Sequence, residues 1–322
     1  MGHSIKTQMQ YAFDTVADSK GQSKRSYRGA HDGYDEKVFS RSYGKDLRTD
    51  RMPHFARYLK ENYPDVKMVK DIKPEHLQGY FDLMAKTCNT TTLGTRKEQM
   101  KKIEQICQKC YGRMNWKTED VRIPMSECPE HVREYVATDE VYKTLKDDMR
   151  THGRSEAWKS LPLSRYAGCR LNEAAEIKIG RLIDHGGRWG YGTITLQGKD
   201  DGTKGGRWRT VDITSPEALQ DLKEAIGTRS GGEYVIQKEK GGRFADNDSI
   251  SARIRDAVKR TGAELPKHNK NHAFRKLFAQ DSYDLARCSG DSKRDAADYS
   301  NKQLGHGKNR DDDTRRYVHN QW

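Results

Sequence analysis

The sequence predicts a mainly helical protein with a small antiparallel β-sheet, organised as two domains. Apolar residues recur at spacings of three and four over most of the chain, which is the period of amphipathic helices. Two short segments, YGTITLQ and WRTVDIT, alternate instead like half-buried strands, and turn-forming residues separate them. The length of 322 residues exceeds what one core usually supports, so we expect two domains.

The N-terminal part of the chain divides into a polar segment and a helical domain. Residues 1–44 are rich in Ser, Gly, Lys and Arg, and we expect a partly ordered basic arm in preference to one short helix. Residues 45–120 carry helical patterns: one helix stops before Pro64, Pro74 lies in the first turn of a second, and a long amphipathic helix covers 92–116.

The long helix has a basic polar side. It carries only two glutamates against six basic residues: Arg96, Lys97, Lys101, Lys102, Lys109 and Arg113. A solvated charged face is one interpretation. The basic bias equally favours a helix that follows DNA phosphates, and we take these six residues as the candidate DNA-binding set.

The C-terminal part begins after an extended linker. Residues 121–137 contain two prolines and predict that linker. Residues 138–322 form the second domain, in which Thr138 and Ser215 cap helices. Further helices are expected at 248–260, 271–286 and 294–304, the two strands at 191–197 and 208–214, and a brief apolar run at 234–236.

The charge balance indicates a polyanionic partner. The chain has 60 Lys and Arg against 47 Asp and Glu, a net charge of +13, which favours nucleic acid. No apolar run approaches the length of a membrane span, and the N-terminus lacks the apolar core of a secretory signal. We therefore expect a cytoplasmic protein with reduced thiols and no membrane association.

The cysteines suggest packing more than metal binding. Cys107 and Cys110, followed by Cys128 and His131, approach the spacing of a zinc ribbon. However, Cys107 and Cys110 also continue the apolar face of the long helix. We expect core cysteines and no metal, and keep a structural zinc as the alternative.

Four segments of the C-terminal part carry residues suited to attack on a phosphodiester. Arginine and lysine neutralise phosphate oxygens, histidine moves protons near neutral pH, and tyrosine becomes a nucleophile in cationic surroundings. Each segment alone has an ordinary explanation, such as a surface ion pair, a solvated turn lysine or a packing histidine. The candidate catalytic residues are Arg170, Lys204, His272, Arg275, His306 and Tyr317, with Glu173 and His319 as supporting residues.

In this order and spacing, the segments resemble the tyrosine recombinase (phage integrase) family. The matching motifs are Gly168-Cys169-Arg170-Leu171-Asn172-Glu173, Lys204 on a β-turn, His272-Ala273-Phe274-Arg275, Leu304-Gly305-His306 and Tyr317-Val318-His319. The resemblance covers about residues 138–319. It implies that 138–322 is the catalytic domain, and less specifically that 45–120 is a core-binding domain that contacts DNA.

The resemblance implies a reaction and a role for each residue. Tyr317 attacks a DNA phosphate to give a 3′-phosphotyrosyl link and a free 5′-hydroxyl. Arg170 and Arg275 bind the phosphate oxygens, the two histidines assist, and Lys204 protonates the leaving oxygen. Glu173 and His319 orient their neighbours. Neither metal nor ATP is needed, and four subunits, monomeric in solution, act as a synaptic tetramer on double-stranded DNA.

Two departures from the family pattern stand out. Tyr317 follows His306 by eleven residues, where the family usually has about nine, because GKNRDDDTRR carries an insertion. Only five residues follow Tyr317, so the C-terminal helix that many relatives dock on a neighbour is absent, replaced by the N-terminal arm, or cut off with the sequence.

The sequence leaves more than one function open. The leading hypothesis is a site-specific recombinase or integrase of a phage or other mobile element. A type IB topoisomerase-like or telomere-resolving nicking–closing enzyme shares the catalytic set. An inactive DNA-binding regulator of the same fold is the alternative of a different class.

Overall fold

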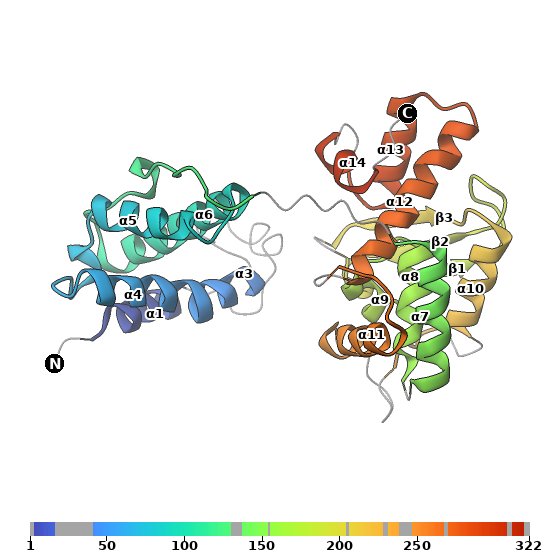
Figure 1. Cartoon of the computed structure of the whole chain (residues 1–322), viewed down its shortest axis with the longest axis horizontal. Helices are drawn as coiled ribbons and strands as arrows, with labels where there is room; N and C mark the ends of the chain where they lie inside the picture. The colour runs from blue at the N-terminus through green and yellow to red at the C-terminus, as the bar shows by residue number, and fades with distance from the viewer. Residues whose placement is uncertain are drawn as a thin grey trace. The chain divides into compact units, whose positions relative to one another are not determined.

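The computed structural model describes residues 3–16, 41–129, 137–153, 155–203, 206–227, 231–237, 247–266, 270–307 and 311–318. Contacts within the chain divide it into two units, residues 1–132 and 133–322, which are described separately (Figure 1). The division falls inside the segment 121–137 that the sequence marks as a linker. No helix among the described residues is long and apolar enough to cross a membrane.

The regular elements of the described part of the first unit are all helices. Proline occupies the first turn of both α4 and α5, where its missing N–H costs no helical hydrogen bond. The Asn89 side chain caps α6 by accepting from the Thr92 amide. The elements are α1 (Ile5–Val16), α3 (Arg41–Asp46), η1 (Leu47–Arg51), α4 (Met52–Asn62), η2 (Val69–Asp71), α5 (Pro74–Ala85), α6 (Thr90–Tyr111) and η3 (Thr118–Asp120).

Helix α1 corrects the expectation of a basic arm for residues 5–16. Ile5, Met9, Ala12 and Phe13 follow one another at spacings of four, three and one residues, so they share one face of the helix. All four are buried in the core of the first unit. That stripe packs on α6 and α4. The sequence analysis missed this pattern because it used the polar composition of residues 1–44 and not the spacing of their few apolar residues. The rest of the expected arm, 17–40, lies outside the described residues.

The long basic helix ends earlier than predicted. Helix α6 stops at Tyr111 because Gly112 adopts a φ of +81°, a left-handed conformation that ends helices and suits glycine. Trp116, predicted inside the helix, instead folds back into the core beside Phe55, and its indole donates to the Val69 carbonyl at 3.3 Å.

The first part of the expected linker belongs to the first unit. Val121 is buried in that unit's core. Gln78 and Arg122 exchange two hydrogen bonds of 3.0 and 3.1 Å, and the Glu127 amide donates to the Ala85 carbonyl. Residues 121–129 are therefore anchored along α5, despite their prolines, because their backbone groups find partners there. Residues 130–136 of the linker lie outside the described part.

The second unit surrounds a three-stranded antiparallel sheet with helices, as Figure 1 shows. The sheet order is β1-β2-β3, with Ile194 opposite Val211. The elements are α7 (Asp139–His152), η4 (Glu156–Lys159), α8 (Ser160–Tyr166), α9 (Leu171–Glu176), β1 (Leu182–Ile183), β2 (Thr193–Gln197), η5 (Gly198–Asp201), β3 (Trp208–Asp212), α10 (Pro216–Ile226), α11 (Asn247–Thr261), α12 (Lys270–Cys288), α13 (Lys293–Gln303) and α14 (Asp311–Tyr317). The predicted fold class, mainly helical with a small antiparallel sheet, is confirmed.

Helix α12 organises the part of this unit that matters for function. It packs against α8, α11, α13 and α14. Phe274, Phe278 and Ala279 bury its apolar face in the main core. The run 234–236 is not a strand of the sheet; Tyr234 forms an isolated bridge with Lys178, and Val235 and Ile236 fill the core. The packing of α12 thus fixes the position of the helix that carries His272 and Arg275.

Candidate active site

Arg170 is positioned by a glycine turn between two helices. Gly168, just after α8, has a φ of +56°, and a Cβ there would meet the Phe278 ring at 2.5 Å, so only glycine fits. The chain then enters α9 with Arg170 as its N-cap. The Arg170 amide donates to Glu173 at 2.7 Å, and its guanidinium donates to the same carboxylate at 2.9 Å. The Arg170 side chain is thus fixed, yet it stays 27% exposed.

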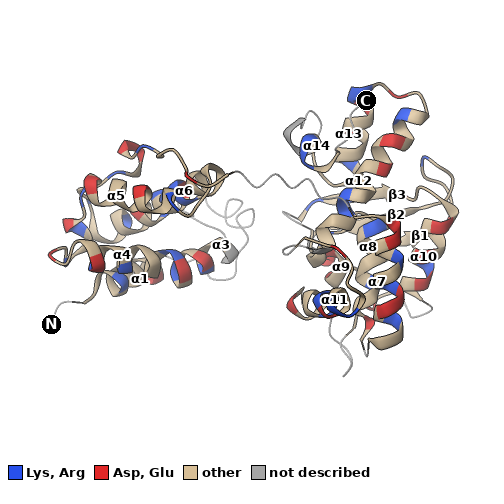
Figure 2. Ribbon diagram, viewed as in Figure 1, with Lys and Arg blue, Asp and Glu red and all other residues tan. Residues whose placement is uncertain are grey.

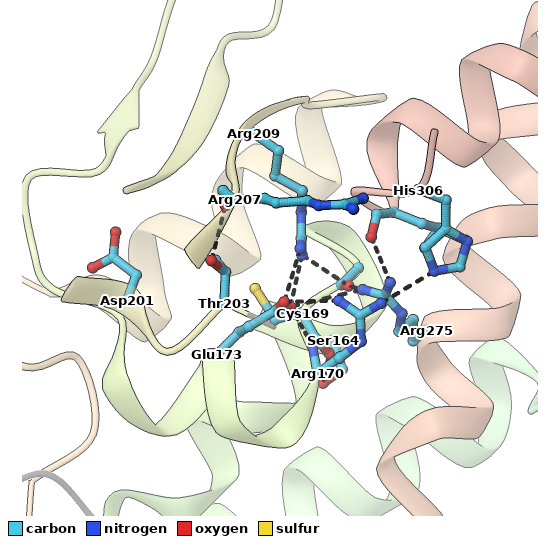
Figure 3. Close-up of polar contacts among 12 residues, drawn as sticks. Ser164, Cys169, Arg170, Glu173, Asp201, Thr203, Arg207, Arg209, Arg275 and His306 are labelled. Atoms are coloured by element: carbon cyan, nitrogen blue, oxygen red, sulfur yellow. Dashed lines mark hydrogen bonds and ion pairs between the residues drawn. The ribbon is translucent and has the colours of Figure 1, made fainter. Parts of the chain in front are cut away.

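Glu173 is a buried carboxylate shared by three arginines (Figure 3). Arg209 donates to both of its oxygens, at 2.9 and 2.8 Å, and a guanidinium nitrogen of Arg275 lies 3.8 Å away. Burial opposes the negative charge, but the bond from Arg209 and the charges of the three arginines outweigh it and lower the pKa of Glu173 to about 2. Glu173 is therefore ionised at neutral pH.

Arg275 lies under the site rather than at its surface. Its side chain is fully buried and donates to the carbonyls of Gly168 and Leu304. Burial, followed by the charges of Arg170 and Arg209, lowers its pKa to about 10, so it keeps its charge at neutral pH. In this state Arg275 supplies positive charge from below. Its guanidinium is not exposed for the phosphate contact that the resemblance implies.

His306 is brought to Arg170 by the end of α13. Gly305, with a φ of +75°, turns the chain, and the His306 amide donates to the Asn301 carbonyl at 2.8 Å. Its Nε2 lies 3.1 Å from a guanidinium nitrogen of Arg170 (Figure 3). Because a guanidinium only donates, Nε2 accepts this bond, which places the proton of a neutral His306 ring on Nδ1.

Tyr317 completes the cluster from the last turn of α14. Its ring centroid lies 5.2 Å from that of His272 and 5.3 Å from that of His306. The guanidinium carbon of Arg275 lies 5.6 Å from the same ring. The side chain is 8% exposed. Helix α14 accommodates the longer interval between His306 and Tyr317, so that interval does not separate them.

Five of the six candidate catalytic residues therefore meet in one place. Arg170, His272, Arg275, His306 and Tyr317 come from α9, α12, the end of α13 and α14. Lys204 lies outside the described residues, as does His319. Of the residues that flank the gap at 204–205, the Gly206 amide donates to the Thr203 carbonyl at 3.0 Å.

Arg209 is a site residue that the sequence analysis missed. It is 8% exposed, and besides Glu173 it donates to the Gly168 carbonyl at 3.3 Å. Burial alone would lower the pKa of Arg209, but the bond to Glu173 raises it. The sequence could have indicated Arg209. Alternation in WRTVDIT puts Arg209 on the inward face with Val211, and a charged side chain at an inward position needs a buried partner.

Five of the six candidate DNA-binding residues lie on α6 and Arg113 lies just after it; four of the six are engaged within their own unit. Arg96 donates to Gln99, Lys97 to the Val121 carbonyl, Lys101 to Glu119, and Lys102 to Gln105. Lys109 and Arg113 are exposed. Figure 2 shows basic and acidic residues interspersed over the helices of both units. The six residues thus do not form one uniformly open basic face.

The zinc alternative finds no support around Cys107. That thiol is buried in the first core, and burial raises its pKa to about 12. No group of three His, Cys, Asp or Glu within the described ranges is placed to hold a metal ion. His131 lies outside those ranges.

Comparison with known proteins identifies the fold. Residues 127–281 match the family model described as Integrase. XerH site-specific recombinase bound to a palindromic difH substrate is similar, with a TM-score of 0.61 and 14% identity over 98% of this chain and 91% of that one. A lambda integrase tetramer bound to a Holliday junction has a TM-score of 0.60 and 14% identity, over 99% of this chain and 78% of that one. The Tn1549 transposon integrase in complex with transposon right-end DNA has a TM-score of 0.53 and 13% identity, over 86% of this chain and 94% of that one.

No curated protein matches the chain. The family match nevertheless covers three of the described residues of the cluster, Arg170, His272 and Arg275, and the solved structures share the fold around them. The resemblance expected from the sequence is confirmed. Residues 127–281 form an integrase-family domain, and the chain has the fold of the tyrosine recombinases.

Proposed function

We propose that this protein is a site-specific DNA recombinase or integrase that cuts and rejoins strands through a 3′-phosphotyrosyl link on Tyr317. The observation that carries the proposal is the position of the Tyr317 ring, which lies 5.2 and 5.3 Å from the rings of two histidines and over the guanidinium of Arg275. These neighbours place a proton acceptor and a fixed positive charge beside the side chain that attacks in the proposed reaction.

In the first step, the Tyr317 oxygen forms a bond to the scissile phosphorus while the bond to the 5′-oxygen breaks. The phenolic proton passes to His272, since Nε2 of His306 already accepts from Arg170, and Lys204 gives a proton to the leaving 5′-oxygen. Arg170 meets a non-bridging oxygen because Glu173 and His306 hold its guanidinium at the exposed edge of the site. Attack by a 5′-hydroxyl on the phosphotyrosine reverses the step and rejoins the strand.

Arg275 contributes mainly through charge. Its guanidinium is fixed by two backbone carbonyls beneath the tyrosine ring, so it stabilises the negative charge of the transition state without reorganising. A direct bond from Arg275 to phosphate requires Tyr317 to move aside when DNA binds. The described side chains need no metal ion for these steps.

The partner of this chemistry is double-stranded DNA. We assign DNA binding to the first unit, where Lys109 and Arg113 of the basic set are exposed and the other four donate to partners within the unit. Strand exchange between two duplexes requires four copies, so we propose a homotetramer in the synaptic complex. The protein acts where its DNA substrate lies, in the cytoplasm.

Two assays test this function. DNA from either side of the gene is incubated with the protein, and covalently attached oligonucleotides are mapped; Tyr317→Phe serves as the inactive control. A two-site assay then follows the mapped sequence. Exchanged products support a recombinase, whereas relaxation of supercoils without exchange supports a nicking–closing enzyme. Binding without any covalent attachment would leave a DNA-binding regulator as the remaining reading.

A further inference from the structure

A groove of about 520 Å³ adjoins the active site. It lies between the exposed face of β2 and β3 and the end of α13, and His306 forms part of its wall. The strand residues on this face include Thr195 and Thr210, whose hydroxyls lie 3.1 Å apart. The groove therefore begins where the scissile phosphate is bound in the proposed reaction.

Trp208 presents an open aromatic surface in this groove. Its side chain is 68% exposed. The other side of the indole rests on Gly198, because a Cβ built there would meet the indole Cδ1 and Nε1 at 2.9 Å. Gly198 has a φ of +61° and leaves room for the ring where an L side chain would not. The backbone thus supports one edge of the ring, which is otherwise largely exposed and forms part of the groove lining.

The groove is electrostatically suited to a nucleotide. Arg207 and Lys302 contribute positive charge to its lining. Asp212, which also contributes to the lining, is held by hydrogen bonds from the Arg188 amide, Tyr299 and Gln303. An aromatic ring beside cations is the combination with which proteins hold single nucleotides, the ring stacking on a base and the cations meeting phosphates.

We propose that Trp208 is a stacking platform for the base of the nucleotide that carries the freed 5′-hydroxyl after cleavage. The inference rests on the proposed function. The choice of the leaving strand end rests on the proposed role of Lys204 as proton donor to the 5′-oxygen. In the described part of the same segment, the Gly206 carbonyl and the Trp208 ring both lie against Gly198. Once cut, that nucleotide has lost its phosphate bond, and stacking on Trp208 keeps its hydroxyl close for rejoining.

The test uses the duplex mapped by covalent capture and measures cleavage and rejoining separately. Trp208→Ala is expected to slow rejoining by roughly 5- to 150-fold, the usual effect of losing one aromatic–base stack, and to change cleavage less. Trp208→Phe retains most of the rate. Tyr191→Ala, which removes an exposed aromatic residue that does not line this groove, is the matched control and leaves rejoining unchanged.

A double-mutant cycle assigns the effect to the base. An abasic site at the 5′-hydroxyl nucleotide should slow the wild-type protein as Trp208→Ala does, and the combination should add little. Equal rejoining by wild type and Trp208→Ala, or fully additive losses, overturns the platform while leaving the recombinase intact. Absence of any covalent adduct with the wild-type protein refutes the proposed function and the platform with it. Thermal unfolding of Trp208→Ala verifies that the exposed substitution leaves the fold intact.

Discussion

Replacing Glu173 by glutamine should destabilise the catalytic unit in a way that depends on pH. The carboxylate is fully buried among Arg170, Arg209 and Arg275, and its pKa falls from an ordinary 4.5 to about 2. Each pKa unit corresponds to 1.36 kcal/mol, so folding favours the ionised carboxylate by about 3 kcal/mol. Glutamine keeps the shape of the side chain but leaves the buried charge of Arg209 without its counter-ion.

The sign of the pH dependence follows from the lowered pKa of Glu173. Its stabilisation is complete above pH 4.5, the pKa in the unfolded chain, and is lost as the pH falls toward 2. The difference between wild type and Glu173→Gln should therefore be about 3 kcal/mol at neutral pH, with less than half of it left near pH 3. Above pH 6 the difference should be constant.

The assay is urea unfolding of the full chain at several pH values, with the transition of the catalytic unit followed by its tryptophan fluorescence. Glu176→Gln is the matched control from the same helix. Burial and then the charge of Asp201 raise the pKa of Glu176, so neutralising it should cost no stability at neutral pH. A loss below about 1 kcal/mol for Glu173→Gln, or one that does not shrink in acid, would refute the shared-carboxylate arrangement.

Three further predictions concern other residues. Arg209→Lys loses the planar fork whose two nitrogens donate separately to the two oxygens of Glu173, so strand cleavage should fall on the order of tenfold or more while DNA affinity in a gel-shift assay stays nearly constant; parallel losses would make Arg209 a DNA anchor. Gly305→Ala strains a φ of +75° and places a methyl group 3.0 Å from the Arg209 Cδ, so it should slow cleavage while Gly307→Ala, with open space at its Cβ, does not. Met9→Ala should lower the free energy of unfolding of the first unit by about 2–5 kcal/mol, measured with urea, because α1 is part of its core. A loss near zero would favour the partly ordered arm that the sequence suggested.

Local chemistry in the sequence was sufficient for most elements. Pro74 in the first turn of α5, and caps at Thr138 and Ser215, marked helix starts that the structure has at those residues. Strands β2 and β3 followed from alternation. The two-residue strand β1 was missed because so short a segment has no period to detect. Helix α14 was missed because its sequence, DDDTRRY, has no apolar stripe of its own.

Tertiary context decided the remaining differences. Composition favoured an arm for residues 1–44, although four apolar residues of α1 are enough to anchor a helix to an existing core. Prolines at 124 and 129 suggested a linker, whereas backbone hydrogen bonds to α5 hold 121–129 in place. Which backbone groups find distant partners is a property of the fold and cannot be read from neighbouring residues.

The site was predictable as a set of residues but not as a geometry. Order and spacing identified the five that the structure gathers, from Arg170 to Tyr317. The burial of Arg275 and the role of Arg209 depend on how β3 packs against α9 and on the turn at Gly305. The sequence showed that one side of α6 is basic. It did not show that residues 119–121 pack back against the helix, where Lys97 donates to the Val121 carbonyl and Lys101 to Glu119.

The identity of the residue that becomes joined to DNA tests the account most directly. Wild-type protein would be incubated with DNA flanking its gene, digested with protease and nuclease, and searched by tandem mass spectrometry for a nucleotide-bearing peptide. We predict a 3′-phosphonucleotide on Tyr317, one of 16 tyrosines in the chain, and none in the Tyr317→Phe variant. An adduct on any other residue, or one that persists in the variant, would contradict Tyr317 as the nucleophile.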